Sequence, residues 1–96
     1  MSEHSVADTL DLAADLIEER GWCRNAYADD SGRVCAYQAL FLAGEVCEAA
    51  QAAQAFRRAT GEVSITHWND QVAFDQADVV NHLHKAAEAA RAEVSA

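Results

Sequence analysis

The chain has 96 residues, of which 51% are hydrophobic, and carries a formal net charge of −9 with no basic run. This length suits one domain, 1–96, with a single modest core, and the charge makes phosphate backbones and anionic membrane surfaces poor partners. Alanine dominates the apolar residues, proline is absent and there are four glycines. That composition favours helices joined by short connections and argues against a disordered chain.

The first predicted element is an amphipathic helix over about residues 5–20. Ser5 is its expected N-cap, and apolar side chains then recur at helical spacing along one face (Val6, Leu10, Ala13 and Ile17). Gly21 supplies a residue that can adopt positive φ, so we expect the helix to end there.

The next segment, 22–35, lacks helical periodicity. We interpret 22–27 as extended, and the run Asp29-Asp30-Ser31-Gly32 as a turn. Val34 and Cys35 could pair back on the extended piece as a minimal two-strand hairpin between the first and second helices. The same residues are equally compatible with a plain loop.

A nearly continuous apolar stretch at 34–43 predicts a helix that is buried or lies in an interface. Gly44 interrupts it, and Glu45 and Glu48 then suit the first turn of a further helix. That helix has an expected inner stripe of Val46, Ala49, Ala53 and Phe56, with Gly61 as its stop. One helix bent at Gly44 over 34–59 is the alternative to two helices, which we favour.

The residues 63–69 alternate in the manner of a strand, and we expect a short extended connection there. Asp75, with Asp78 three positions later, then opens the last helix, whose inward positions are Val79, Val80, Leu83, Ala87 and Ala90. The predicted fold is therefore an all-α compact bundle of about four helices.

Three cysteines, Cys23, Cys35 and Cys47, cannot all pair within one chain. The start of the sequence has no basic region followed by an apolar run, and no apolar stretch approaches the ~18 residues of a membrane span. We therefore expect reduced thiols, a cytoplasmic location and no membrane partner.

A thiol nucleophile at Cys35 is the sharpest enzymatic hypothesis. It would lie near a helix start, where the helix dipole favours thiolate, with His67 as base and Asn69 or Asp70 orienting the imidazole in a hydrolase or transferase. Cys35 sits between Val34 and Ala36, however, where a buried inert thiol is the commoner outcome. We therefore expect a protein that is not an enzyme.

Metal and cofactor sites find little support in the sequence. There is no Cys-x-x-Cys pair, and His82 and His84 point to different sides of a helix. Asp78 and His82 lie four apart and could share an ion, but an exposed polar pair explains them as well. No glycine-rich phosphate loop or basic aromatic patch is present, so we expect no metal, no cofactor and no nucleic-acid partner.

Trp22 and Trp68 are the heaviest side chains in this alanine-rich sequence. They either fill the core, with each indole N–H bonded to a carbonyl, or act as aromatic anchors on a binding surface. The core is the favoured interpretation. Asn69 and Asp70 are expected to cap a turn or a helix.

An acidic line of Asp8, Asp11, Asp15 and Glu18 repeats about every 5 Å along the first helix, given the ~1.5 Å rise per residue. Such a line, with Asp11 and Asp15 at its centre, could imitate a phosphate backbone and inhibit a DNA-binding protein. A solvated helix face is the favoured explanation.

Three stretches together resemble a known family. Leu12-Ala-Ala-Asp-Leu-Ile-Glu-Glu-Arg-Gly-Trp22 leads into an extended piece, Asp30-Ser-Gly-Arg-Val-Cys-Ala36 precedes the apolar helix, and Trp68-Asn-Asp70 precedes the last one. The chain resembles a family of small uncharacterised domains from actinobacteria and their phages. The resemblance implies a helical fold and an accessory role, and it brings no catalytic residue.

The leading functional hypothesis is a non-enzymatic protein–protein interaction module. The apolar helix at 34–43 and the alanine-rich face at 46–56 both need cover, which another protein or a second copy in a homodimer would supply. Because the family that the chain resembles occurs in phages, we expect the module to modulate a host protein.

Overall fold

Helices make up most of residues 5–95, the part of the chain that the computed structural model describes. They are α1 (Val6–Arg20), α2 (Ala36–Ala43), α3 (Val46–Thr60), α4 (Ile65–His67), which continues into the π-helical turn η1 (Trp68–Val72), and α5 (Gln76–Ser95). The predicted all-α class is confirmed. The predicted count of about four helices is one too low, because the short helix α4 was not predicted.

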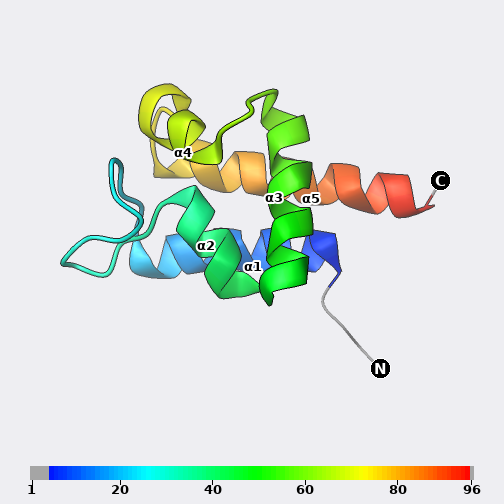
Figure 1. Ribbon diagram of the computed structural model, residues 1–96, viewed down its shortest axis with the longest axis horizontal. Coiled ribbons are helices and arrows are strands. Elements are labelled where there is room, and N and C mark those ends of the chain that lie inside the picture. The colour runs from blue at the N-terminus through cyan, green and yellow to red at the C-terminus, as the bar shows by residue number, and fades with distance from the viewer. Residues whose placement is uncertain (1–4, 96) are drawn as a thin grey trace.

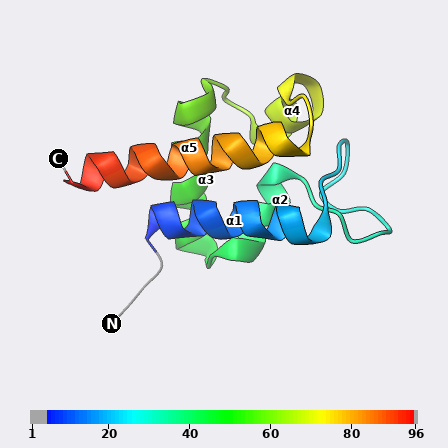
Figure 2. The ribbon, with the colours of Figure 1, turned by 180° about the vertical axis from the view of Figure 1, so that it is seen from behind.

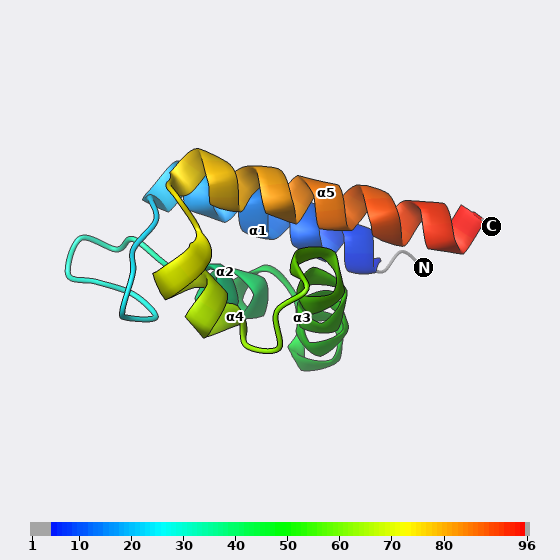
Figure 3. The same cartoon turned by 90° about the horizontal axis from the view of Figure 1, so that it is seen from above.

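The helices form two layers. Helices α1 and α5 lie side by side and run antiparallel, with α5 returning along the whole of α1 (Figure 1). Figure 3 shows α2, α3 and α4 together on one side of this pair. From behind, α3 passes across both members of the pair (Figure 2). The segment 21–35 extends from the end of the molecule where α1 ends and α5 begins.

Local capping signals set the bounds of α1. The Ser5 hydroxyl accepts the Asp8 N–H at 3.1 Å, and the Gly21 N–H donates to the Ile17 carbonyl at 2.7 Å. Gly21 has φ +96°, a conformation that L side chains rarely adopt. The helix predicted over about residues 5–20 is confirmed.

The chain forms two separate helices here, α2 and α3, as favoured from the sequence, and not one helix bent at Gly44. Gly44 stands between them with an extended backbone, and a Cβ added there would lie 2.9 Å from Thr9 Cγ2 of α1. Glycine is therefore required by close approach to α1 and not by its φ. Glu45 and Glu48 stand at the start of α3, as predicted, and together they also form a capping box. The inward placement predicted for Val46 is wrong, because this first residue of α3 is 76% exposed.

The two-strand hairpin is not seen in the described chain. Isolated bridges join Val34 to Trp22 and to Ala28, but no ladder follows them. The Asp29 carboxylate accepts the main-chain N–H groups of Ser31 and Arg33. These bonds form a compact turn. A continuing ladder would need the same two N–H donors, so the segment folds as a loop.

The extended connection predicted at 63–69 is also wrong. The Ser64 hydroxyl accepts the His67 N–H at 3.1 Å and caps α4. Ile65 and Trp68, three positions apart, are both buried, which is the spacing of a helix face. The Ala73 N–H then reaches the Trp68 carbonyl at 2.8 Å, five residues back, which defines the π-helical turn.

A single connected cluster of buried side chains lies between the two layers. Its largest fully buried members are Phe56, Leu10, Ile17, Leu40 and Leu83, and alanines fill most of the remaining positions. The Phe56 and Trp68 rings meet edge to face at 5.1 Å. Small side chains allow the helices to approach closely, while a few large ones supply most of the buried apolar area.

None of the helices in the described range combines the length and the apolar character that a bilayer crossing demands.

Candidate functional site

The Asn69 side chain joins three segments that are distant in sequence. Its Oδ1 accepts the Trp22 indole N–H at 2.6 Å and the Ala36 main-chain N–H at 2.9 Å, and its Nδ2 donates to the Cys23 carbonyl and to Asp70 Oδ1, both at 3.0 Å. We call these five residues the Asn69 junction. Asn69 is completely buried, and each of its donor hydrogens and both oxygen lone pairs have a partner.

The junction also caps a helix from a distance. Ala36 is the first residue of α2, so its N–H has no acceptor within the helix. Asn69 provides that acceptor from η1. The sequence correctly indicated a capping role for Asn69, but not that the capped helix begins 33 residues earlier.

Asp70 extends the junction to the loop. Its Oδ1 also accepts the Asn25 N–H at 2.8 Å, and Asn25 has φ +65°, a left-handed conformation. Nearby, the Arg24 guanidinium lies 4.6 Å from the Trp22 ring centre and donates to the carbonyls of Ala73 and Phe74. Loop 21–35 is thus tied to the stretch after α4 by side chains.

A cavity of about 260 Å³ opens beside this junction, and we call it the junction pocket. Its walls carry a carboxylate, a hydroxyl, an aromatic ring and a thiol, and its lining residues are Asn25, Ala26, Tyr27, Cys35, Thr66 and Asp70. A π-helical turn, a left-handed asparagine and a buried polar network all border it. Such departures from regular geometry cluster at functional sites, which makes this the candidate site of the fold.

Cys35 lies at the pocket but is buried. Its Sγ accepts the Gln38 N–H at 3.4 Å and serves as the N-cap of α2. Burial raises the pKa of the Cys35 thiol, and the nearby Asp70 charge acts in the same direction. A thiol kept protonated is a weak nucleophile, so the pocket is better suited to binding than to thiol chemistry.

His67 is not part of the pocket. It lies on α4 with an exposed side chain, and no hydrogen bond among residues 5–95 joins its imidazole to the sulfur of Cys35. Of the three residues in the nucleophile hypothesis, the fold brings Cys35 and Asp70 to one cavity and leaves His67 outside it.

A row of aromatic rings runs from the junction pocket along α2. The Tyr27 and Tyr37 ring centres lie 5.7 Å apart, and Tyr37 and Phe41 lie 4.8 Å apart. Tyr27 is exposed, while Tyr37 and Phe41 are half-buried. The row ends at a hollow of about 500 Å³ at the α2–α3 corner, which Phe41 shares with the exposed Val46. We call Tyr27, Tyr37, Phe41 and Val46 the aromatic surface.

Sequence reasoning did not single out this surface. The spacing of Tyr37 and Phe41, four positions apart in an apolar helix, does indicate that their rings share one face. The position of Tyr27 beside them carries no sequence signal, because it depends on how loop 21–35 folds.

The two tryptophans belong to the interior. Trp68 is buried and packs on Phe56 and on the His82 ring, while Trp22 is half-buried against the core. The Trp22 N–H bonds to the Asn69 amide oxygen and not to a main-chain carbonyl. Both rings therefore pack in the interior and stabilise the elements that carry the site.

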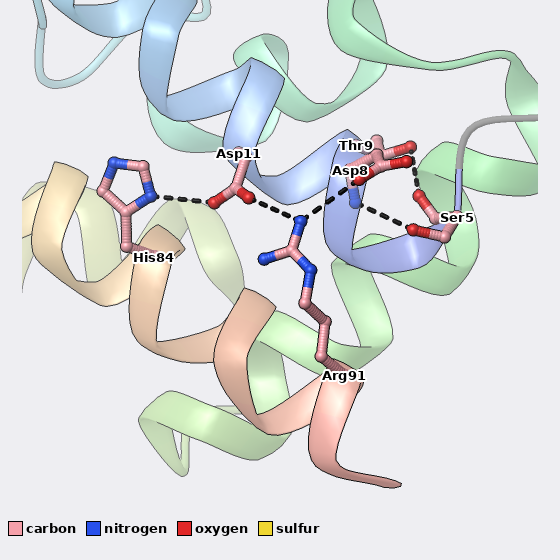
Figure 4. Close-up of polar contacts among 6 residues, drawn as sticks. All are labelled: Ser5, Asp8, Thr9, Asp11, His84 and Arg91. Atoms are coloured by element: carbon pink, nitrogen blue, oxygen red, sulfur yellow. Dashed lines mark hydrogen bonds and ion pairs between the residues drawn. The ribbon is translucent and has the colours of Figure 1, made fainter. Parts of the chain in front are cut away.

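The first two carboxylates of the acidic line on α1, Asp8 and Asp11, contact side chains of α5 (Figure 4). Asp11 accepts from His84 Nδ1 and from Arg91, each at 2.8 Å, and Asp8 accepts from Arg91 at 3.1 Å. The Arg91 hydrogen bond lowers the pKa of Asp8 below its ordinary value. Asp15 is exposed. Two members of the acidic line, Asp8 and Asp11, therefore share the Arg91 guanidinium within the chain.

No cluster of three or more metal-binding side chains occurs in the described part of the chain. His82 Nδ1 faces its helix neighbour Asp78, 2.8 Å from the main-chain carbonyl and 3.2 Å from the carboxylate. His84 instead contacts Asp11. The two histidines point to different partners, as their spacing indicated.

The chain belongs to the family of unknown function DUF6197, whose pattern matches residues 1–89. The resemblance seen in the sequence is therefore confirmed at the level of a small domain family without an assigned function. No curated protein and no solved structure matches the chain significantly.

Proposed function

We propose that this chain is a non-catalytic module that binds a protein partner through the aromatic surface. The observation that carries the proposal is the row of three aromatic rings that continues into the hollow at Val46. Contiguous exposed apolar groups are uncommon on monomers unless something covers them, and aromatic side chains dominate binding energy at interfaces.

The chemistry of the junction pocket supports binding over catalysis. Cys35 is buried with a raised thiol pKa, and the exposed His67 does not line the cavity. The carboxylate beside the sulfur opposes thiolate formation and does not activate the thiol. A hydrolase or transferase built on Cys35 would need the opposite electrostatics.

The alternative of a DNA mimic has weaker support. It requires the α1 carboxylates to present an unbroken negative line, whereas Asp8 and Asp11 are engaged by Arg91 and His84. Asp15 and Glu18 remain exposed to solvent, but two adjacent carboxylates do not reproduce the extended row of charges of a phosphate backbone.

In-cell photo-crosslinking at Phe41 tests the proposal. A photoreactive phenylalanine analogue replaces Phe41 and, in a separate control variant, the exposed Glu88 on α5. We expect a discrete protein adduct from position 41 and none from position 88. Replacing Val46 with aspartate in the position-41 variant should abolish the adduct, because the charge would enter the shared hollow.

Val63→Asp is the matched control for Val46→Asp. Both valines are strongly exposed, and Val63 follows the opposite end of α3, away from the hollow. The adduct should survive Val63→Asp. An adduct that is equally strong with Val46→Asp, or is absent from position 41, would overturn the proposed binding surface.

The remaining parts of the functional hypothesis rest on the sequence. We predict a cytoplasmic protein with an accessory, host-modulating role in actinobacteria or their phages, without metal or cofactor. The mass of the adduct distinguishes a second copy of the chain from a different protein, so one experiment addresses both kinds of partner.

A further inference from the structure

We propose that the junction pocket receives a lysine or arginine side chain from a basic segment of the partner, while apolar residues beside that cation cover the aromatic surface. This inference rests on the proposed function and specifies the chemistry of the partner. Its basis is that Tyr27 belongs to both features, because it lines the pocket and begins the aromatic row.

The pocket contains a carboxylate without a cation. Asp70 Oδ1 accepts two N–H groups, whereas Oδ2 has neither a hydrogen bond nor an ion pair with any residue that the structure describes. Arg24, which precedes the pocket residue Asn25, donates its hydrogen bonds to the carbonyls of Ala73 and Phe74. A carboxylate in a recess attracts an ammonium or guanidinium group more strongly than one in open solvent.

The other walls of the pocket suit the same ligand. Tyr27, Thr66 and Asn25 also line the cavity, and aromatic rings, hydroxyls and amide oxygens are groups that favour a cation. The volume, about 260 Å³, is below the range of drug-sized ligand sites and fits a single side chain.

The geometry outside the pocket suits an extended segment. From Tyr27 the ring-centre steps are 5.7 Å and 4.8 Å, each shorter than the ~7 Å between alternate side chains of an extended chain, so two or three such side chains span the whole row. A peptide with a cation at one position and apolar side chains at following positions can therefore contact the pocket and the row together.

The charge of the whole chain opposes a second copy as the occupant. Each copy carries a formal net charge of −9, so two aromatic surfaces would meet against like-charge repulsion. A basic partner gains from the same field, which also raises its rate of encounter.

Peptide binding monitored by NMR tests this inference. Three blocked peptides of equal length are titrated into the isotopically labelled full chain. One carries lysine flanked by leucines, the second carries norleucine in place of lysine, and the third carries lysine flanked by serines. We expect the first to bind at least about fivefold more tightly than either of the others, with shifts at the amides of Asn25 and Tyr27 and along α2.

Asp70→Asn isolates the charge. The asparagine retains an oxygen that can accept from Asn25 and Asn69, so the junction keeps its hydrogen bonds. We expect this variant to lose the advantage of the lysine peptide and to bind the norleucine peptide unchanged. Asp30→Asn removes the same charge from an exposed position on loop 21–35, outside the junction pocket, and should leave all affinities unchanged.

Several results would overturn the inference. They are equal affinity for the lysine and norleucine peptides, equal losses in Asp70→Asn and Asp30→Asn, or concentration-dependent dimerisation that shifts the same amides without peptide. The photo-crosslink at position 41 would still form if a partner covered the aromatic surface without using the pocket. Failure of this inference is therefore distinguishable from failure of the proposed function.

Discussion

The α1–α5 layer and loop 21–35 are held in place by different means. The helix pair is stabilised by many small apolar contacts and by the polar contacts of Asp8 and Asp11 with His84 and Arg91. The loop has no regular secondary structure and depends on the Asn69 junction. A substitution in the first region removes one of many contacts, whereas the second region is held by a few side chains, chiefly Asn69, Asp70 and Arg24.

The largest expected effect is a difference in alkylation rate between the cysteines of the two regions. This difference measures how rarely each region opens to solvent. Cys47 is exposed at the start of α3, while Cys23 and Cys35 are buried in and beside the loop, and burial raises the pKa of both thiols. If the junction opens as rarely as a packed helix, Cys47 should react with iodoacetamide at least about 100-fold faster than the other two. Peptide mass spectrometry of timed samples measures each rate.

Rapid alkylation of Cys35 under native conditions would contradict this view of the junction. A Cys47→Ser variant provides the control, because it should show only the slow phases.

Asn69→Ala should produce the largest loss of stability. It removes four hydrogen bonds and leaves the Ala36 N–H and the Cys23 carbonyl without their partner. We expect the free energy of unfolding to fall by about 3–5 kcal/mol, since each orphaned buried group costs about 1–3 kcal/mol. Urea denaturation measures this change, and Asn81→Ala on the exposed side of α5 is the control, with a change of about 0.5 kcal/mol or less.

A fall below about 1 kcal/mol for Asn69→Ala would show that the loop is held mainly by other contacts, and the distinction between the two regions would be lost.

Gly44→Ala tests the close approach between the two layers. The new Cβ would lie 2.9 Å from Thr9 Cγ2, and Thr9 is completely buried. Because the backbone at Gly44 is one that any residue adopts, the cost is steric overpacking of about 1–3 kcal/mol. Reversal of part of the loss in Gly44→Ala/Thr9→Ser, which removes the clashing methyl group, would identify the contact. An undiminished loss in the double variant would place the cause elsewhere.

Arg91→Gln should have the smallest effect, and that effect depends on pH. The Arg91 hydrogen bond lowers the pKa of Asp8 from its ordinary value of 3.8. A depressed carboxyl pKa stabilises the folded state above the unfolded value, and this contribution disappears as pH falls through the folded one. The difference in urea midpoint between wild type and Arg91→Gln should therefore be constant near neutral pH and diminish under acid conditions.

A difference that grows on acidification would contradict the assigned ion pair. Arg58→Gln is the comparison, since its partner Glu93 lies 3.8 Å away with both side chains largely exposed. We expect its replacement to have almost no effect on the midpoint.

The helices could be predicted from the sequence to the extent that their signals are local. Ser5 and Gly21 bracket α1, Glu45 and Glu48 open α3, and Asp75 accepts the Asp78 N–H at the start of α5. Each of these interactions spans only a few residues, so the sequence pattern contains both partners.

The site could not be predicted in the same way. Three of the four partners of Asn69 lie 33 to 47 residues away along the chain, and no pattern marks a side chain that serves such distant groups. The alternation at 63–69 gave the wrong prediction of an extended connection. Ile65 and Trp68 face the core at helical spacing, and Ser64 caps the helix. Local periodicity was ambiguous over so few residues, and tertiary contacts decided the outcome.

The π-helical turn makes the length of this stretch critical. The bond from the Ala73 N–H to the Trp68 carbonyl accommodates one residue more than an α-helical turn would. A one-residue deletion between them would restore α-helical spacing but rotate everything after it by about 100° relative to Asn69. Asn69, which holds loop 21–35, and the long helix α5 could then no longer both contact their neighbours, so changes in length should be tolerated here far less well than substitutions at positions other than Asn69.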